Sequence, residues 1–75
     1  MKELVEYIAK SIVNSPDEVQ VTEEEDEQGT ILKLQVADED KGRVIGKQGR
    51  IVGAMRTLLR VKAARESTRA TLEIV

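Results

Sequence analysis

Apolar residues recur at helical spacing at the start of the chain. Within residues 1–13 they fall on one stripe: Leu4, Val5, Ile8, Ala9, Ile12 and Val13. Glu6 and Lys10 lie on the opposite side, so this segment predicts an amphipathic helix. Pro16 has no backbone N–H and disfavours helical geometry in the residue before it. We therefore expect the helix to end at Asn14 and Ser15.

Two later segments alternate between apolar and polar residues. Val19 and Val21 mark the first segment, and the second contains Leu32, Leu34 and Val36. A period of two is typical of a strand with one buried face. Because an acidic run at 23–27 and the pair Gln28-Gly29 lie between them, the two segments predict a β-hairpin with an acidic tip.

The rest of the chain predicts two helices and a strand. A short helix spans Glu39 to about Ile45, and the acidic residues 38–40 are placed to cap its start. Residues 46–49 interrupt the helical pattern, and a longer helix then runs to about Arg65. Its predicted apolar seam consists of Ile51, Met55, Leu58 and Leu59. Alternation from Ala70 to Val75 predicts the last strand.

The element order α-β-β-α-α-β indicates an α+β fold, with a three-stranded sheet covered on one face by three helices. The two helices between the second and third strands are long enough for a crossover, so we expect these strands to be parallel and the sheet to be mixed. Residues 1–75 fit one domain. A domain of this size buries only about 60% of its unfolded surface, so association with a second copy would add stability.

Composition argues against most enzyme chemistry, because the 75 residues include no cysteine and no histidine. Residues 24–35 resemble part of a calcium-binding loop, but Gln35 replaces the final glutamate and the flanks predict strands. We therefore expect no metal and no cofactor. No run of about 18 apolar residues occurs, so we expect no membrane insertion and a cytoplasmic location.

Charge is segregated along the chain, although its net value is only −2. Residues 1–40 contain three basic and twelve acidic side chains, whereas residues 41–75 contain nine basic and two acidic ones. The net charge alone would argue against a nucleic-acid-binding protein. The asymmetry instead predicts that the second half presents a surface for an anionic partner.

Two glycines three residues apart, Gly46 and Gly49, predict a tight bend between the short and the long helix. We expect this bend to leave the N–H groups at the start of the long helix exposed, where they favour phosphate. Lys47 and Arg50 add positive charge. The spacing differs from that of a nucleotide triphosphatase loop, in which Ser or Thr would stand where Gln48 does.

The sequence Val44-Ile45-Gly46-Lys47-Gln48-Gly49, in this element order, resembles the type II KH domain. Over essentially its whole length the chain resembles the KhpA family of small bacterial RNA-binding proteins. The resemblance implies a non-enzymatic protein that grips the backbone of about four nucleotides of single-stranded RNA. Its implied contacts are Gly46, Lys47, Gln48 and Gly49 as the clamp, Arg43 and Arg50 flanking the strand, and Val44 and Ile45 in the groove floor or the core beneath.

The resemblance also implies an RNA chaperone or post-transcriptional regulator, acting as a homodimer or with a larger partner of the KhpB (Jag) type. Tyr7 is the only aromatic residue, so base stacking is not the main grip, and we expect it to be half-buried on its helix. Arg56 and Arg60 fit a solvated face as well as a contact to RNA or to an acidic partner. The alternative function is a protein-interaction adaptor whose KH fold is a docking surface and whose RNA binding is incidental.

Overall fold

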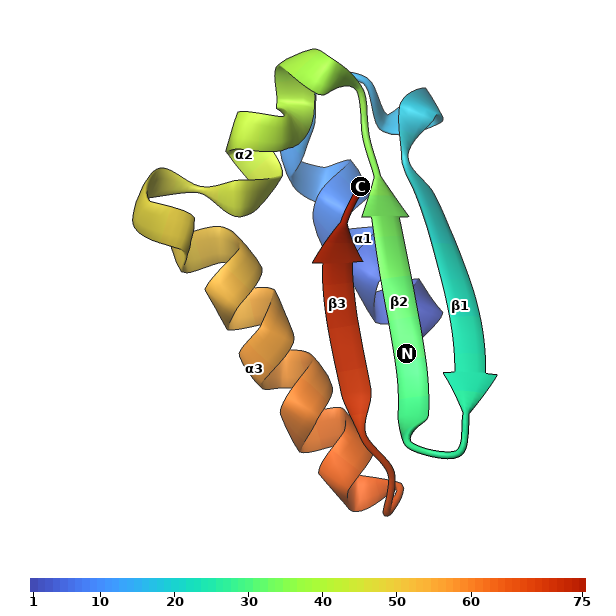
Figure 1. Cartoon of the computed structure of the whole chain (residues 1–75). Helices are drawn as coiled ribbons and strands as arrows, with labels where there is room; N and C mark the ends of the chain where they lie inside the picture. The colour runs from blue at the N-terminus through green and yellow to red at the C-terminus, as the bar shows by residue number, and fades with distance from the viewer.

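The computed structural model describes all residues from 1 to 75. Figure 1 shows the predicted order of helices and strands. The elements are α1 (Lys2–Ile12), β1 (Gln20–Asp26), β2 (Gly29–Gln35), α2 (Lys41–Ile45), α3 (Arg50–Arg65) and β3 (Ala70–Ile74). Three short 3-10 turns connect them: η1 (Pro16–Glu18), η2 (Asp38–Asp40) and η3 (Lys47–Gly49). No helix is both long enough and apolar enough to span a bilayer.

The sheet has the strand order β1-β2-β3 and is mixed, as predicted. β1 and β2 are antiparallel, with Val21 opposite Leu34, and β3 runs parallel to β2, with Leu72 opposite Leu32. These apolar residues point to the same face because strand side chains alternate. The hairpin turn and the α2–α3 connection lie at opposite ends of the sheet (Figure 1).

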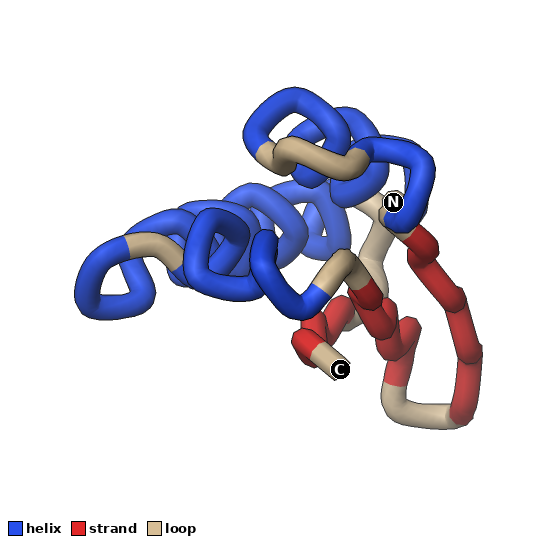
Figure 2. Tube along the Cα trace, turned by 90° about the horizontal axis from the view of Figure 1, so that it is seen from above, coloured by secondary structure: helices blue, strands red, loops and turns tan.

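All helices lie on one side of the sheet, as the view from above shows (Figure 2). The core between the two layers includes Leu32 and Leu34 from β2, Val5 from α1 and Leu59 from α3, each at most 1% exposed. Burial of each leucine contributes about 1.5–3 kcal/mol. The core thus fixes α3 against the sheet, and α3 begins at the glycine-flanked bend.

The predicted apolar seam of α3 is partly wrong. Met55 and Leu59 are buried, but Ile51 and Leu58 are 36% and 49% exposed. The buried stripe consists of Val52, Met55, Leu59 and Ala63. At 100° per residue, its centre lies about 60° around the helix from the predicted seam. The apolar surface of α3 is wider than the sheet covers, and helical spacing alone does not show which part is buried.

The acidic residues before α2 do not cap it as predicted. Neither η2 nor α2 receives a hydrogen bond from a capping side chain. Asp38 instead forms an exposed ion pair with Lys41, at 3.3 Å, whereas Asp40 is fully buried. A third prediction is wrong on α1, where Tyr7 is 74% exposed rather than half-buried. Its position faces away from the sheet.

Candidate nucleic-acid interface

The bend between α2 and α3 depends on Gly46. Its backbone has φ 78° and ψ 168°, a conformation in which residues with a Cβ atom are strained. A Cβ atom at this position would lie 2.6 Å from Cγ1 and 2.8 Å from the backbone nitrogen of Ile51. The first turn of α3 therefore packs directly against the bend, and only glycine fits there.

The second glycine is under a weaker constraint. Gly49 has φ 72° and ψ 18°, in the left-handed region, but open space surrounds the position of its missing Cβ atom. Gln48 is also left-handed, with φ 58°. Two consecutive left-handed residues reverse the chain, and they leave the side chains of Lys47 and Gln48 exposed at its outermost point.

The prediction of bare amides at the start of α3 is wrong for two of them. The N–H of Gly49 donates to the carbonyl oxygen of Gly46 at 3.1 Å, and the N–H of Arg50 donates to that of Lys47. These two hydrogen bonds, each spanning three residues, satisfy both donors internally. Anion binding at the bend must therefore depend more on side-chain charge than the sequence indicated.

Three cations surround the bend: Arg43, Lys47 and Arg50, all exposed. Lys47 and Arg50 form no ion pair with a carboxylate, and the Nη2 of Arg50 donates to Oε1 of Gln48 at 3.3 Å. Arg43 is different, because its Nε lies 3.9 Å from Oδ1 of the buried Asp40. The structure thus brings the predicted basic residues together on one exposed projection.

The two aliphatic residues before the bend have separate roles. Val44 is fully buried and belongs to the core beneath the bend. Ile45, the last residue of α2, is 38% exposed. Of the two predicted groove residues, only Ile45 can offer apolar contact to a ligand beside the bend.

Arg56 and Arg60 also differ from each other. The Nε and Nη2 atoms of Arg56 both donate to the carbonyl oxygen of Leu72, at 3.3 and 3.2 Å, so Arg56 ties α3 to the edge strand β3. Arg60 is exposed and forms no hydrogen bond or ion pair within the domain. Both arginines line a shallow recess of about 140 Å³ along the edge of β3, with Ala70, Thr71 and Leu72.

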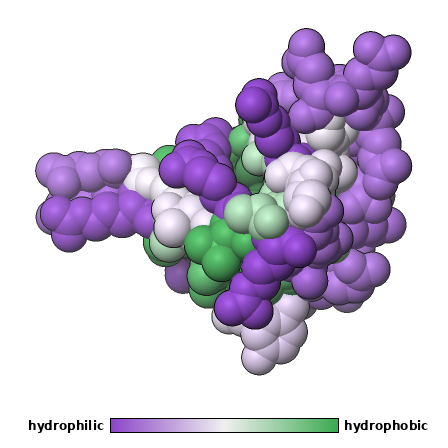
Figure 3. Space-filling model, turned by 90° about the horizontal axis from the view of Figure 1, so that it is seen from below, coloured by the Kyte–Doolittle hydropathy of each residue, from purple (hydrophilic) through white to green (hydrophobic).

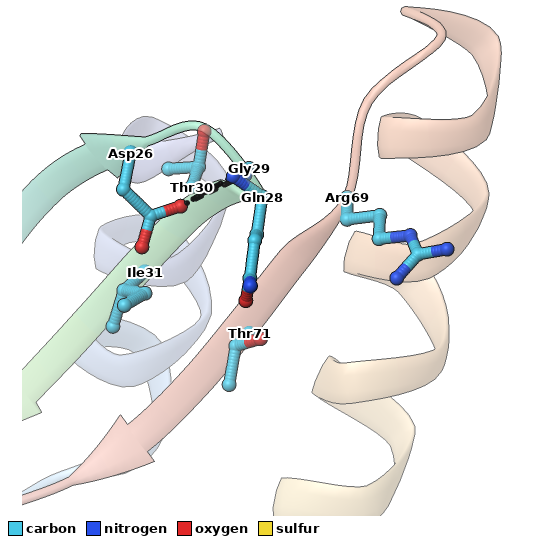
Figure 4. Close-up of a pocket in the computed structure, with 7 residues that line it drawn as sticks. All are labelled: Asp26, Gln28, Gly29, Thr30, Ile31, Arg69 and Thr71. Carbon is cyan, nitrogen blue, oxygen red and sulfur yellow. Dashed lines mark hydrogen bonds between the residues drawn. The ribbon is translucent and has the colours of Figure 1, made fainter.

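The hairpin tip holds a second recess, of about 160 Å³, at the far end of the sheet (Figure 4). Asp26 uses its Oδ1 atom to accept the N–H groups of Gln28 and Gly29, at 2.7 and 3.1 Å, so its carboxylate stabilises the turn. Arg69 points away from that carboxylate (Figure 4). On α1, a hydrogen bond from its own backbone N–H and the nearby N-terminal ammonium lower the pKa of Glu3. Neither feature contributes to the basic projection.

An α-β-β-α-α-β order with a glycine-flanked bend between its last two helices defines a KH domain of the type II topology. The family model described as "KhpA/KhpB, KH domain" matches residues 2–74, and the chain belongs to this family. It is 56% identical to RNA-binding protein KhpA of Clostridium acetobutylicum and 51% identical to that of Clostridium perfringens, in both cases over the whole of both chains. The KhpA of Treponema pallidum is 51% identical over 99% of this chain and 92% of its own. No solved structure gives a significant match.

Proposed function

We propose that this domain binds single-stranded RNA through the bend at residues 46–49 and catalyses no reaction. The observation that carries the proposal is the exposed projection on which Arg43, Lys47 and Arg50 surround that bend. The relatives named RNA-binding protein KhpA support RNA as the anionic partner. The bend lies at the end of the domain opposite the acidic hairpin (Figure 1), so an anion bound there is well separated from the hairpin carboxylates.

The proposed contacts divide between backbone and base. Lys47 and Arg50, which have no carboxylate partner, neutralise phosphates, and Gln48 at the tip offers polar groups to the sugar-phosphate chain. Ile45 lies beside them and gives one base an apolar contact. With its single aromatic residue on α1, the domain has no stacking platform, so we expect binding of low sequence specificity.

The edge of β3 extends the proposed path of the strand. Arg60 has a free guanidinium beside the recess there, whereas the guanidinium of Arg56 is already bonded to Leu72. We therefore assign an additional phosphate contact to Arg60 and a structural role to Arg56. Three to five phosphate contacts give a slope of log affinity against log salt of about −2 to −3.5.

A double substitution at the tip tests the proposal. Lys47→Asp with Gln48→Asp reverses the charge of the bend without changing its glycines. We expect it to abolish binding of a fluorescent single-stranded RNA, measured by anisotropy. Lys2→Asp with Gln28→Asp makes the same chemical change at the opposite end of the domain and should leave the affinity within about twofold. Equal effects of the two pairs, or unchanged binding by the first, would reject the clamp.

The exposed apolar residues of α3 favour a second, protein-binding function. Ile51, Leu58 and Val61 are 36–52% exposed and follow each other at intervals of seven and three residues, the spacing of a helix-packing seam. From below, apolar atoms gather between hydrophilic projections on either side (Figure 3). We propose that this seam contacts a second copy of the chain or a larger KhpB-type protein, and that the pair acts as an RNA chaperone or regulator.

The mass in solution tests the seam. Leu58→Asp places a charge in its centre, whereas Thr57→Asp places the same charge on the neighbouring exposed residue. We expect sedimentation to give a dimer for the unmodified chain and for Thr57→Asp, and a monomer for Leu58→Asp. A monomeric unmodified chain at high concentration would reject the homodimer. If Leu58→Asp retained full RNA affinity as a monomer, the seam would serve protein docking alone.

A further inference from the structure

Asp40 is the only fully buried charged side chain of the domain, and the proposed RNA clamp makes no direct use of it. It stands at the start of α2, six residues before Gly46. A buried carboxylate is costly unless hydrogen bonds and an opposite charge compensate it. The hydrogen-bond and ion-pair partners of Asp40 therefore indicate its role in the domain.

Those partners come from two directions. The Oδ1 atom accepts the backbone N–H of Asn14 and the Oδ2 atom accepts that of Ser15, both at 3.0 Å. Both donors belong to the segment that leaves α1, about 25 residues away in the sequence. On the other side, the Nε of Arg43 lies 3.9 Å from Oδ1. One buried carboxylate thus connects the end of α1 to a cation beside the bend.

We propose that Asp40 is a positioning residue for the RNA site: it holds α2 against the end of α1 and orients Arg43 toward the phosphate chain. The inference rests on the RNA-binding function proposed above. α2 has only five residues, too few to be stable without such a tie, and the bend directly follows it. Arg43 is half-exposed, so its guanidinium can reach solvent while Asp40 restrains its direction.

The neighbouring carboxylate of Asp38 provides a matched control. Asp40→Asn and Asp38→Asn remove the same charge, two residues apart, but the side chain of Asp38 is 97% exposed. A general charge effect would strengthen RNA binding equally in both variants. If Asp40 positions the site, Asp40→Asn instead weakens binding about tenfold, whereas Asp38→Asn leaves it within about twofold. Circular dichroism melts establish that both variants are folded at the assay temperature.

Two further readouts separate positioning from general stability. Loss of the Arg43 contact should make the salt slope shallower by about 0.7, because one phosphate is no longer neutralised. In an Arg43→Gln background, Asp40→Asn should cause a smaller additional loss of affinity than it causes in the unmodified chain, because only its hold on the end of α1 remains to be lost. Equal affinities of Asp40→Asn and Asp38→Asn, or a full additional loss in the Arg43→Gln background, would overturn the proposal.

If Asp40→Asn does not fold, Arg43→Lys and Arg50→Lys decide the question. Both keep the positive charge, but only Arg43→Lys removes an Nε atom that lies beside Asp40. A larger loss of RNA affinity for Arg43→Lys supports the proposal, and equal losses reject it. The Lys47→Asp and Gln48→Asp pair is measured in parallel. If this double variant binds RNA with normal affinity, the proposed RNA-binding function is wrong. If the double variant loses RNA binding but the Asp40 tests give the contrary result, only the proposed role of Asp40 is wrong.

Discussion

The two glycines of the bend should differ strongly in what they tolerate. In Gly46→Ala, the new Cβ atom lies less than 3.0 Å from both backbone and side-chain atoms of Ile51, in a backbone conformation that non-glycine residues rarely adopt. Gly49→Ala meets no atom within 4 Å and has only the left-handed conformation to accommodate. Gly42→Ala lies within α2, where φ is negative and space is open.

These differences in contact and backbone conformation predict different changes in the free energy of unfolding. The strained backbone and the contact with Ile51 together cost Gly46→Ala about 3 kcal/mol. The left-handed conformation alone costs Gly49→Ala about 1 kcal/mol. Gly42→Ala should gain about 0.5–1 kcal/mol, because alanine is the better helix former. For a domain of this size, 1 kcal/mol changes the Tm by about 4–8 °C.

Thermal melts followed by circular dichroism measure all three variants. We expect the Tm to fall by about 12–24 °C for Gly46→Ala and by about 4–8 °C for Gly49→Ala, and to rise slightly for Gly42→Ala. Equal losses for Gly46→Ala and Gly49→Ala would refute the argument that contact with Ile51 determines the shape of the bend. A stable Gly46→Ala variant with unchanged RNA affinity would also show that this shape is not needed for binding.

Three other predictions concern the rest of the domain. Arg56→Ala loses both hydrogen bonds to the β3 edge and should destabilise the fold by about 1 kcal/mol in urea unfolding, whereas Arg60→Ala should change it by less than about 0.5 kcal/mol; equal effects contradict the tie. Gly29→Ala places a Cβ atom 2.5 Å from the carbonyl oxygen of Arg69, so it should lower the Tm by more than about 8 °C, and an unchanged Tm would show that the hairpin relaxes freely. Replacing the three glutamates at 23–25 by glutamine should leave RNA affinity within about twofold at 0.15 M salt and raise it at 0.01 M; a large rise at 0.15 M would contradict the separation of charges.

Local patterns predicted most of the fold. Alternation at Leu32, Leu34 and Leu72 identified strands whose buried faces coincide in the sheet. The length of the segment between β2 and β3 predicted their parallel pairing, since only a crossover of that length can connect parallel neighbours. The glycine spacing predicted the position of the bend, and Gly46 and Gly49 both have positive φ.

The features that the sequence did not reveal depend on contacts between distant segments. From its place before α2, Asp40 was predicted to cap that helix. Its actual hydrogen-bond partners, Asn14 and Ser15, lie about 25 residues away, so local sequence patterns do not reveal them. By helical spacing alone, Arg56 is expected on the solvent-exposed side of α3. Its guanidinium donates to the carbonyl oxygen of Leu72 only because the fold brings β3 beside α3. Asp40 lies three positions before Arg43, and this helical spacing was the one sequence signal that could have directed attention to it.

The separation of charge explains why the net value is a poor guide to this domain. The acidic hairpin tip and the basic bend lie at opposite ends of a molecule whose longest dimension is 34 Å (Figure 1). At 0.15 M salt the Debye length is about 8 Å, so the tip contributes little to the potential at the bend. An approaching phosphate chain then encounters the local charge of Arg43, Lys47 and Arg50 rather than the net charge of −2. The acidic residues of the hairpin repel a polyanion at their end of the domain. Only the end that carries the bend therefore attracts it.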